Sequence, residues 1–235
     1  TNGLDRAENS GAKIWMHNNF LVERSGKMSK SSGEFLRLQL LVDKGYHPLA
    51  YRLMCLQAHY RSELEFSWEG LQAALTRLKR ILWYIEGWNR NSEADNLALP
   101  ADRYEGLTPE RRRWLEEFNS AISDDLNTAR ALVAFEHAIG VKGKGSMFAA
   151  EGMRVAFTMD EVLGLGLRDL RRLDLRLRPK DASISEAEIE AALARRKEAR
   201  AAKDFATSDA IRDELTASGV EVMDGDPLGW EWKLG

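Results

Sequence analysis

The chain has 235 residues, of which 44% are hydrophobic and 30% are charged, a composition typical of a globular protein rather than a disordered one. Its net charge of −3 argues against non-specific nucleic-acid binding, which depends mainly on positive charge. No apolar run approaches the ~20 residues that a membrane-spanning helix needs, so we expect a cytoplasmic protein without a membrane partner. One cysteine and four histidines lack zinc-ligand spacing, and we expect no metal site within this chain.

The N-terminal part of the chain is predicted to contain a strand followed by helices. Residues 14–22 read as a strand or a pair of strands. Leucines then recur at helical spacing. We expect one helix that stops before Gly45, a second that begins at Pro48, and a third that Ser67 caps and that ends near Gly87.

The middle of the chain is predicted to continue as helices. Residues 89–107 are polar and read as a linker. The string Thr108-Pro109-Glu110 is a start signal for a helix. A further helix is expected to end at Gly140, and another to span Val155–Leu163.

Two adjacent carboxylates, Asp124 and Asp125, have the appearance of paired catalytic groups. They stand beside Asn127 at the start of a predicted helix, where short polar side chains bind free backbone N–H groups. We therefore interpret both aspartates as capping groups of that helix rather than as catalytic residues.

The C-terminal part of the chain changes character. Ser185 followed by Glu188 forms a capping box, and two helices separated by a turn near Asp204 are expected to follow it. Strings 220–223 and 230–233 alternate around a turn and predict a terminal β-hairpin. We expect a mainly α fold: a helical bundle, then a small α+β domain made of a helical hairpin and a β-hairpin.

A five-residue string, Lys27-Met28-Ser29-Lys30-Ser31, carries the clearest chemical signal in the chain. It lies between Gly26 and Gly33, which favour a loop. Two lysines in such a loop, here called the lysine loop, suit the binding of neighbouring phosphates and the stabilisation of charge on a breaking phosphoanhydride. The alternative is a solvated basic surface loop.

The lysine loop and several other strings resemble class I aminoacyl-tRNA synthetases, and specifically the cysteinyl-tRNA synthetase family. The matching strings occur in family order over nearly the whole chain, which makes the resemblance stronger than any one of them. They are Trp15–Asn18, Lys27–Ser31, His59–Ser62, Asp124–Thr128, Ala199–Phe205, Asp209–Leu215 and Gly229–Trp232.

The resemblance implies a division of the chain into four parts. They are a remnant of the catalytic domain with the lysine loop (1–34), linking helices that contact the tRNA stem (35–66), a tRNA-binding helical bundle (67–178) and an anticodon-binding domain (179–235). The family's Rossmann-like domain and zinc site have no counterpart in this sequence. The chain thus resembles the C-terminal half of such an enzyme, and we expect it to be a monomer that is inactive alone.

In the complete enzyme, the resemblance implies ATP-dependent activation of cysteine and its transfer to cysteine tRNA. Lys30, and secondarily Lys27, would stabilise charge on the ATP phosphates, and Met28, Ser29 and Ser31 would complete the ATP-binding loop. ATP would bring Mg²⁺ as its counterion, and zinc would belong to the family's other half.

Recognition of the tRNA anticodon is expected in the last ~50 residues, where stacking and edge hydrogen bonds read unpaired bases. Arg212, Trp230, Trp232 and Asp226 offer this chemistry. The alternatives are core packing for the two tryptophans and an ordinary turn role for Asp226.

The sequence departs from the family pattern at two positions, and three other functions are alternatives to this interpretation. Glu34 stands where the family has asparagine, and its carboxylate is expected to weaken ATP affinity modestly. Ala129 replaces a proline with little consequence.

The alternative functions are a tRNA-binding module without ligase activity, a protein-interaction bundle that retains the lysine loop, and the related ligase that joins cysteine to an amino sugar in mycothiol synthesis. The tail from residue 185 argues against the last, because that relative lacks an anticodon-binding end.

Overall fold

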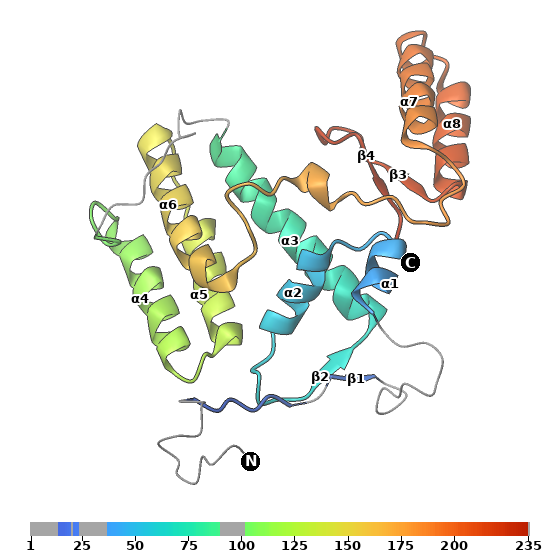
Figure 1. Cartoon of the computed structure of the whole chain (residues 1–235). Coiled ribbons are helices and arrows are strands. Elements are labelled where there is room, and N and C mark those ends of the chain that lie inside the picture. The colour runs from blue at the N-terminus through green and yellow to red at the C-terminus, as the bar shows by residue number, and fades with distance from the viewer. Residues whose placement is uncertain (1–13, 20, 24–36, 90–101, 235) are drawn as a thin grey trace.

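A computed structural model describes residues 14–19, 21–23, 37–89 and 102–234 of the chain. The lysine loop, with its predicted ATP-binding residues Lys27–Ser31, lies outside these residues, as does Glu34. The described part is mainly helical, as the sequence predicts, with two small sheets (Figure 1). None of its helices combines the length and the apolar character needed to cross a membrane.

The first described helices begin where the sequence signals place them. They are α1 (Leu38–Asp43), α2 (Pro48–Leu56) and α3 (Trp68–Asn89). Gly45 adopts a φ of 87° after α1, a backbone conformation that glycine tolerates best. Pro48 occupies the first turn of α2, and the Ser67 hydroxyl accepts a hydrogen bond from the backbone N–H of Gly70 at the start of α3. These local signals therefore fix the helix boundaries correctly.

A parallel pair of strands joins two parts of the chain that lie far apart in sequence. Strand β1 (Leu21–Glu23) pairs with β2 (Leu64–Phe66), with Leu21 opposite Leu64 and Glu23 opposite Phe66. The predicted strand over residues 14–22 overlaps β1 only at Leu21 and Val22, because residues 14–19 form no strand. The sequence does not predict β2. The pair fastens the segment that precedes the lysine loop to the connection between α2 and α3.

The central bundle adds α4 (Pro109–Ser123), α5 (Thr128–Gly140) and α6 (Ser146–Leu163), followed by a short 3₁₀ helix, η3 (Arg172–Leu175). Helix α6 begins nine residues before the predicted start at Val155. Gly152, which weakens the helical signal in the sequence, lies inside this first part of α6. Its Cα is so close to the Trp88 ring that an added Cβ would meet it at 2.9 Å.

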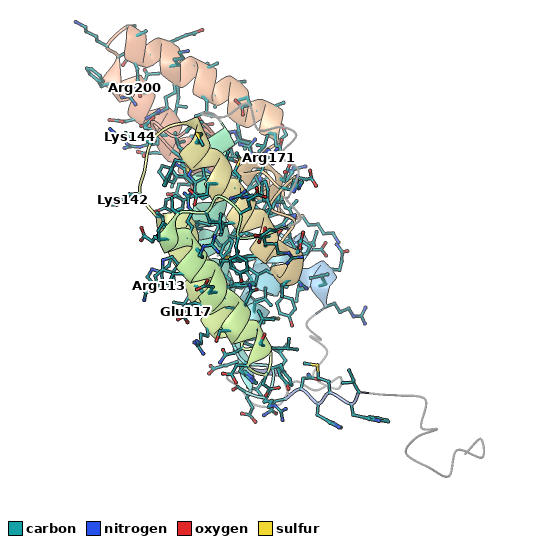
Figure 2. The ribbon with its side chains drawn as sticks, turned by 90° about the vertical axis from the view of Figure 1, so that its left-hand side faces the viewer. Arg113, Glu117, Lys142, Lys144, Arg171 and Arg200 are labelled. Carbon is teal, nitrogen blue, oxygen red and sulfur yellow. The ribbon has the colours of Figure 1, made fainter. Side chains whose placement is uncertain are left out.

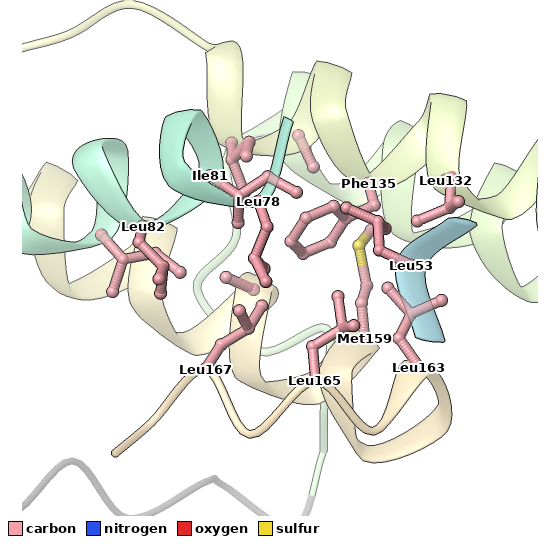
Figure 3. Packing of buried hydrophobic residues seen from close by; sticks show 14 of the residues in the cluster. Leu53, Leu78, Ile81, Leu82, Leu132, Phe135, Met159, Leu163, Leu165 and Leu167 are labelled. Carbon is pink, nitrogen blue, oxygen red and sulfur yellow. The ribbon is translucent and has the colours of Figure 1, made fainter. Parts of the chain in front are cut away.

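The core of the bundle is formed by side chains from helices α1 to α6 and from the chain after α6, and Figure 3 shows part of it. Its members are large aliphatic and aromatic residues, nearly all of them withdrawn from solvent. They include Leu53, Leu78, Ile81, Leu82, Leu132, Phe135, Met159, Leu163, Leu165 and Leu167. The α4–α5 turn and the α2–α3 connection therefore belong to elements that share one hydrophobic core.

The C-terminal unit consists of α7 (Glu186–Ala201), α8 (Phe205–Ala217), β3 (Val220–Val222) and β4 (Trp230–Trp232). Its strands form the predicted antiparallel hairpin. The capping box at the start of α7 is present, because Ser185 and Glu188 exchange hydrogen bonds. A separate small core, made by the two helices and the hairpin, stabilises this unit.

Candidate functional site

The segment that precedes the lysine loop is held by the α2–α3 connection. The backbone N–H of Asn19 donates to the carbonyl of Tyr60 at 2.9 Å, and its side-chain amide donates to the carbonyl of Arg61 at 3.2 Å. The β1–β2 pair continues the same attachment toward Glu23. Residues 59–61, here called the connector, are therefore the point where this segment meets the helical body.

Asp125 binds the connector from the α4–α5 turn. Its carboxylate accepts hydrogen bonds from the Tyr60 hydroxyl at 2.6 Å and from Nε of Arg61 at 2.7 Å. Its backbone carbonyl lies 3.0 Å from Nε2 of His59, which donates in the tautomer that carries a proton there. The hydrogen bonds from Arg61 and then Tyr60 lower the pKa of Asp125. Two strings of the family resemblance, 65 residues apart, thus form one cluster.

The prediction that Asp124 and Asp125 cap α5 is wrong. The cap is Asn127, whose side-chain oxygen accepts from the backbone N–H of Arg130 at 3.1 Å. The backbone passes through the left-handed region at both Asp125 and Leu126, each with a φ of 54°. This turn presents the Asp125 carboxylate to the connector rather than to the start of α5.

The far end of the C-terminal unit combines an exposed ring with cationic side chains. Phe205, the first residue of α8, is 63% exposed. Lys203 precedes it with a φ of 60°, and Arg200 in the last turn of α7 lies 3.1 Å from the Asp224 carboxylate. Arg196 binds both oxygens of Asp224 at 2.7 and 2.8 Å. Hydrogen bonds from Arg196 lower the pKa of Asp224 to about 2.

Trp230 and Trp232 lie in the core of the C-terminal unit. They are 0% and 6% exposed, and their rings meet edge to face with centroids 5.2 Å apart. The indole N–H of Trp230 donates to Glu190 at 2.7 Å, and the Arg176 guanidinium covers the same ring at 3.8 Å from its centroid. The structure thus shows the core-packing arrangement, and a part for these rings in tRNA binding stays a prediction.

Asp226 and Arg212, the other two predicted tRNA contacts, have different environments. Asp226 accepts from the backbone N–H of Leu228 in the β3–β4 turn, and both of its oxygens bind Arg172 at 2.7 and 2.8 Å. Arg212 on α8 is about half exposed, 3.6 Å from Asp209. Asp226 therefore joins the hairpin to η3, whereas Arg212 is accessible from solvent.

Phe205 is the residue that sequence reasoning missed. It stands three residues before Ser208 and six before Ile211, both of which are buried. Helical periodicity therefore predicts a buried Phe205, whereas the structure exposes its side chain at the first position of α8.

Exposed cations also occur on the bundle (Figure 2). Arg113 on α4 and Lys142 and Lys144 between α5 and α6 are exposed on the face shown. The Arg113 guanidinium lies 5.0 Å from the centroid of the Trp114 ring, while nearby Glu117 pairs with Arg130 at 3.0 Å. This face therefore offers cationic groups to a phosphate backbone.

Two protein-family models match this chain, one near each end. Residues 4–76 match the model of the class I (C) tRNA synthetase catalytic domain. Residues 185–227, which include most of the C-terminal unit, match the model of the cysteinyl-tRNA ligase anticodon binding domain. The chain is thus related to the class I tRNA synthetases.

Within this class the chain belongs to the cysteine–tRNA ligase family. It is 65% identical over 234 residues to the cysteine–tRNA ligase of Novosphingobium aromaticivorans, which covers 100% of this chain and 45% of that protein. The cysteine–tRNA ligase of Zymomonas mobilis is 44% identical, over 96% of this chain and 48% of that protein. That of Synechococcus sp. strain CC9605 is 38% identical, over 94% and 48%. The chain spans about half the length of these curated relatives.

Proposed function

We propose that this chain is the part of a cysteine–tRNA ligase that carries the ATP-phosphate loop and the tRNA-binding surfaces. In the complete enzyme, the cysteine carboxylate would attack the α-phosphorus of ATP, pyrophosphate would leave, and cysteine would pass to the 3′ end of its tRNA. Lys30, with Lys27, would stabilise the charge that develops on the phosphates. ATP would carry Mg²⁺, and the zinc of the family would be held outside this chain.

The observation that carries the proposal is the surface at the α7–α8 turn. The exposed aromatic ring of Phe205 begins α8, and the cations Arg200 and Lys203 shortly precede it in sequence, in the unit that matches an anticodon-binding domain. Unpaired bases are bound by stacking on such rings and by contacts from cationic groups to the backbone. We propose Phe205 as the stacking residue and Arg212 as a second contact on α8.

The four-part division of the chain follows from the same proposal. Residues 1–34 would belong to the catalytic domain, 35–66 would contact the tRNA stem, 67–178 would lie along the tRNA, and 179–235 would read the anticodon. The match of 185–227 to an anticodon-binding model supports the last part. It also speaks against the amino-sugar ligase, which lacks such an end.

The test is a titration of the chain, at fixed salt concentration, against cysteine tRNA, an anticodon variant of it and an unrelated tRNA. We expect a preference for the cognate anticodon on the order of 1–3 kcal/mol. Phe205→Ala should remove this preference, while Val133→Ala, which truncates another exposed apolar side chain, on α5, should retain it. Equal, weak binding of all three tRNAs would contradict the proposal.

A separate assay addresses ligase activity. We expect the chain alone to support no cysteine-dependent exchange of pyrophosphate into ATP, because its match to the catalytic-domain model is limited to residues 4–76 and it spans about half the length of its relatives. Exchange by the purified chain would show that this expectation is wrong.

A further inference from the structure

A path of hydrogen bonds runs from the helical bundle to Asn19, which lies just before β1 in the chain. The Asp125 carboxylate holds the side chains of Tyr60 and Arg61. The backbone carbonyls of the same two residues accept the hydrogen bonds of Asn19. Tyr60 and Arg61 therefore each face the bundle with the side chain and the N-terminal segment with the backbone carbonyl.

Further contacts order the connector and the residue before it. The Thr128 hydroxyl at the start of α5 lies 3.4 Å from the carbonyl of Ala58, and His59 stacks on Tyr60 with ring centroids 4.8 Å apart. The Arg61 guanidinium also lies over the Tyr60 ring, 5.2 Å from its centroid. Among the described residues of the bundle, Asp125 contacts the connector with both its side chain and its backbone, as Asn19 does from the N-terminal segment.

The backbone around Asp125 is arranged at a conformational cost. Two consecutive non-glycine residues, Asp125 and Leu126, have positive φ values, and aspartate tolerates this region better than leucine does. Such conformations persist where surrounding contacts determine them. Backbone hydrogen bonds from Leu126 to Ile122 and from Asn127 to Ala121 close the turn onto α4. The contacts of Asp125 with the connector add to them, so the turn and the connector stabilise one another.

We propose that Asp125 is a positioning residue, through which the helical bundle fixes the strand that leads into the lysine loop. It acts through Arg61 and Tyr60, whose backbone carries Asn19 and, beyond it, β1. The relevance of this contact to ATP rests on the proposed function. The contact itself is independent of that function, and it can be tested without ATP or tRNA.

The experiment is hydrogen–deuterium exchange of the full chain, read by mass spectrometry from milliseconds onward. Asp125→Asn retains a residue that tolerates positive φ but removes the charge that binds Arg61. We expect peptides within residues 14–23 to exchange at least about threefold faster in this variant, while peptides of α7 and α8 are unchanged. Arg61→Gln should have the same effect, and the double variant should exchange no faster than either single variant, because both act through one contact.

Asp124→Asn is the matched control, since Asp124 lies in the same turn and its nearest cationic partner is Arg130 at 3.9 Å. We expect unchanged exchange in residues 14–23. The proposal is overturned if Asp125→Asn leaves these peptides unchanged, if exchange accelerates equally throughout the chain, or if the effects of the two single variants add. Loss of the proposed tRNA preference would overturn the function and leave this result intact.

Discussion

Arg172 and Asp226, 54 residues apart, form a two-bond ion pair in which one guanidinium nitrogen lies 2.7 and 2.8 Å from the two carboxylate oxygens. The Arg172 side chain is only 8% exposed. A second ion pair, between Lys79 on α3 and Glu231 on β4, crosses the same boundary. The C-terminal unit is therefore fastened to the bundle through its β-hairpin, while the α7–α8 turn points away (Figure 1).

Replacement of Asp226 by alanine should destabilise the attachment of the hairpin. It leaves the buried guanidinium of Arg172 without its carboxylate, and such a loss costs about 2–4 kcal/mol when the remaining charge stays buried. The measurement is the free energy of unfolding in urea. Asp213→Ala, which removes a highly exposed carboxylate from α8, should change it by less than about 0.5 kcal/mol. Equal effects of the two variants would contradict this account.

Trp230 should behave as a core residue. Trp230→Phe removes the hydrogen bond to Glu190 and is expected to cost about 1 kcal/mol, whereas Trp230→Ala also opens a cavity and should cost about 3–5 kcal/mol. Thermal unfolding of the purified variants measures both. Trp83→Ala, at a half-exposed position on α3, should have a much smaller effect. A Trp230→Ala variant that melts like the parent chain would be incompatible with this burial.

The ion pairs of Asp224 should make the C-terminal unit sensitive to acid. Its pKa in the folded chain is about 2, below the ordinary value of about 3.9 in the unfolded chain. The associated stabilisation is therefore fully present above pH ~4 and is lost as the pH falls toward ~2. Urea unfolding at several pH values should show a smaller loss of stability in this window for Asp224→Asn than for the parent. Identical pH profiles would show that Asp224 does not contribute.

Gly152 should tolerate no side chain. A Cβ there would lie 2.9 Å from both the Trp88 ring and Nη2 of Arg111, and Arg111 is fixed by Glu151 at 3.0 Å. Gly152→Ala should therefore destabilise the bundle by about 1–3 kcal/mol. The control is Gly87→Ala in α3, where an added Cβ meets no atom within 4 Å; it should stabilise the chain by about 0.5–1 kcal/mol. Stabilisation by both substitutions would refute this packing argument.

Local signals in the sequence predict much of the fold, because the residues that carry them act on their own neighbours. Pro48, Ser67 and the Ser185–Glu188 box begin helices by contacts within one turn, and the hairpin follows from alternation around a turn. Strand β2 was missed because its partner is β1, far along the chain. The early start of α6 was missed because Gly152 serves tertiary packing.

The candidate site was less predictable than the fold for the same reason. Asp125 beside Asn127 has the local pattern of a cap, and only the distant connector explains its position. Phe205 has the spacing of a buried residue, whereas Trp230, an attractive stacking residue in the sequence, fills the small C-terminal core. Which aromatic ring faces solvent depends on the packing of two helices on a hairpin, and periodicity alone does not contain this information.

The contact between Asp125 and the connector also has a consequence for the order of folding. Helices α4 and α5 adjoin in sequence and can pack early, whereas the attachment of Asn19 and β1 closes long stretches of chain and comes at a higher entropic cost. During synthesis, residues 14–23 leave the ribosome more than a hundred residues before Asp125 does. The segment that precedes the lysine loop is thus made well before Asp125, the residue that holds its attachment point, and its fixation must wait until the α4–α5 turn has been made.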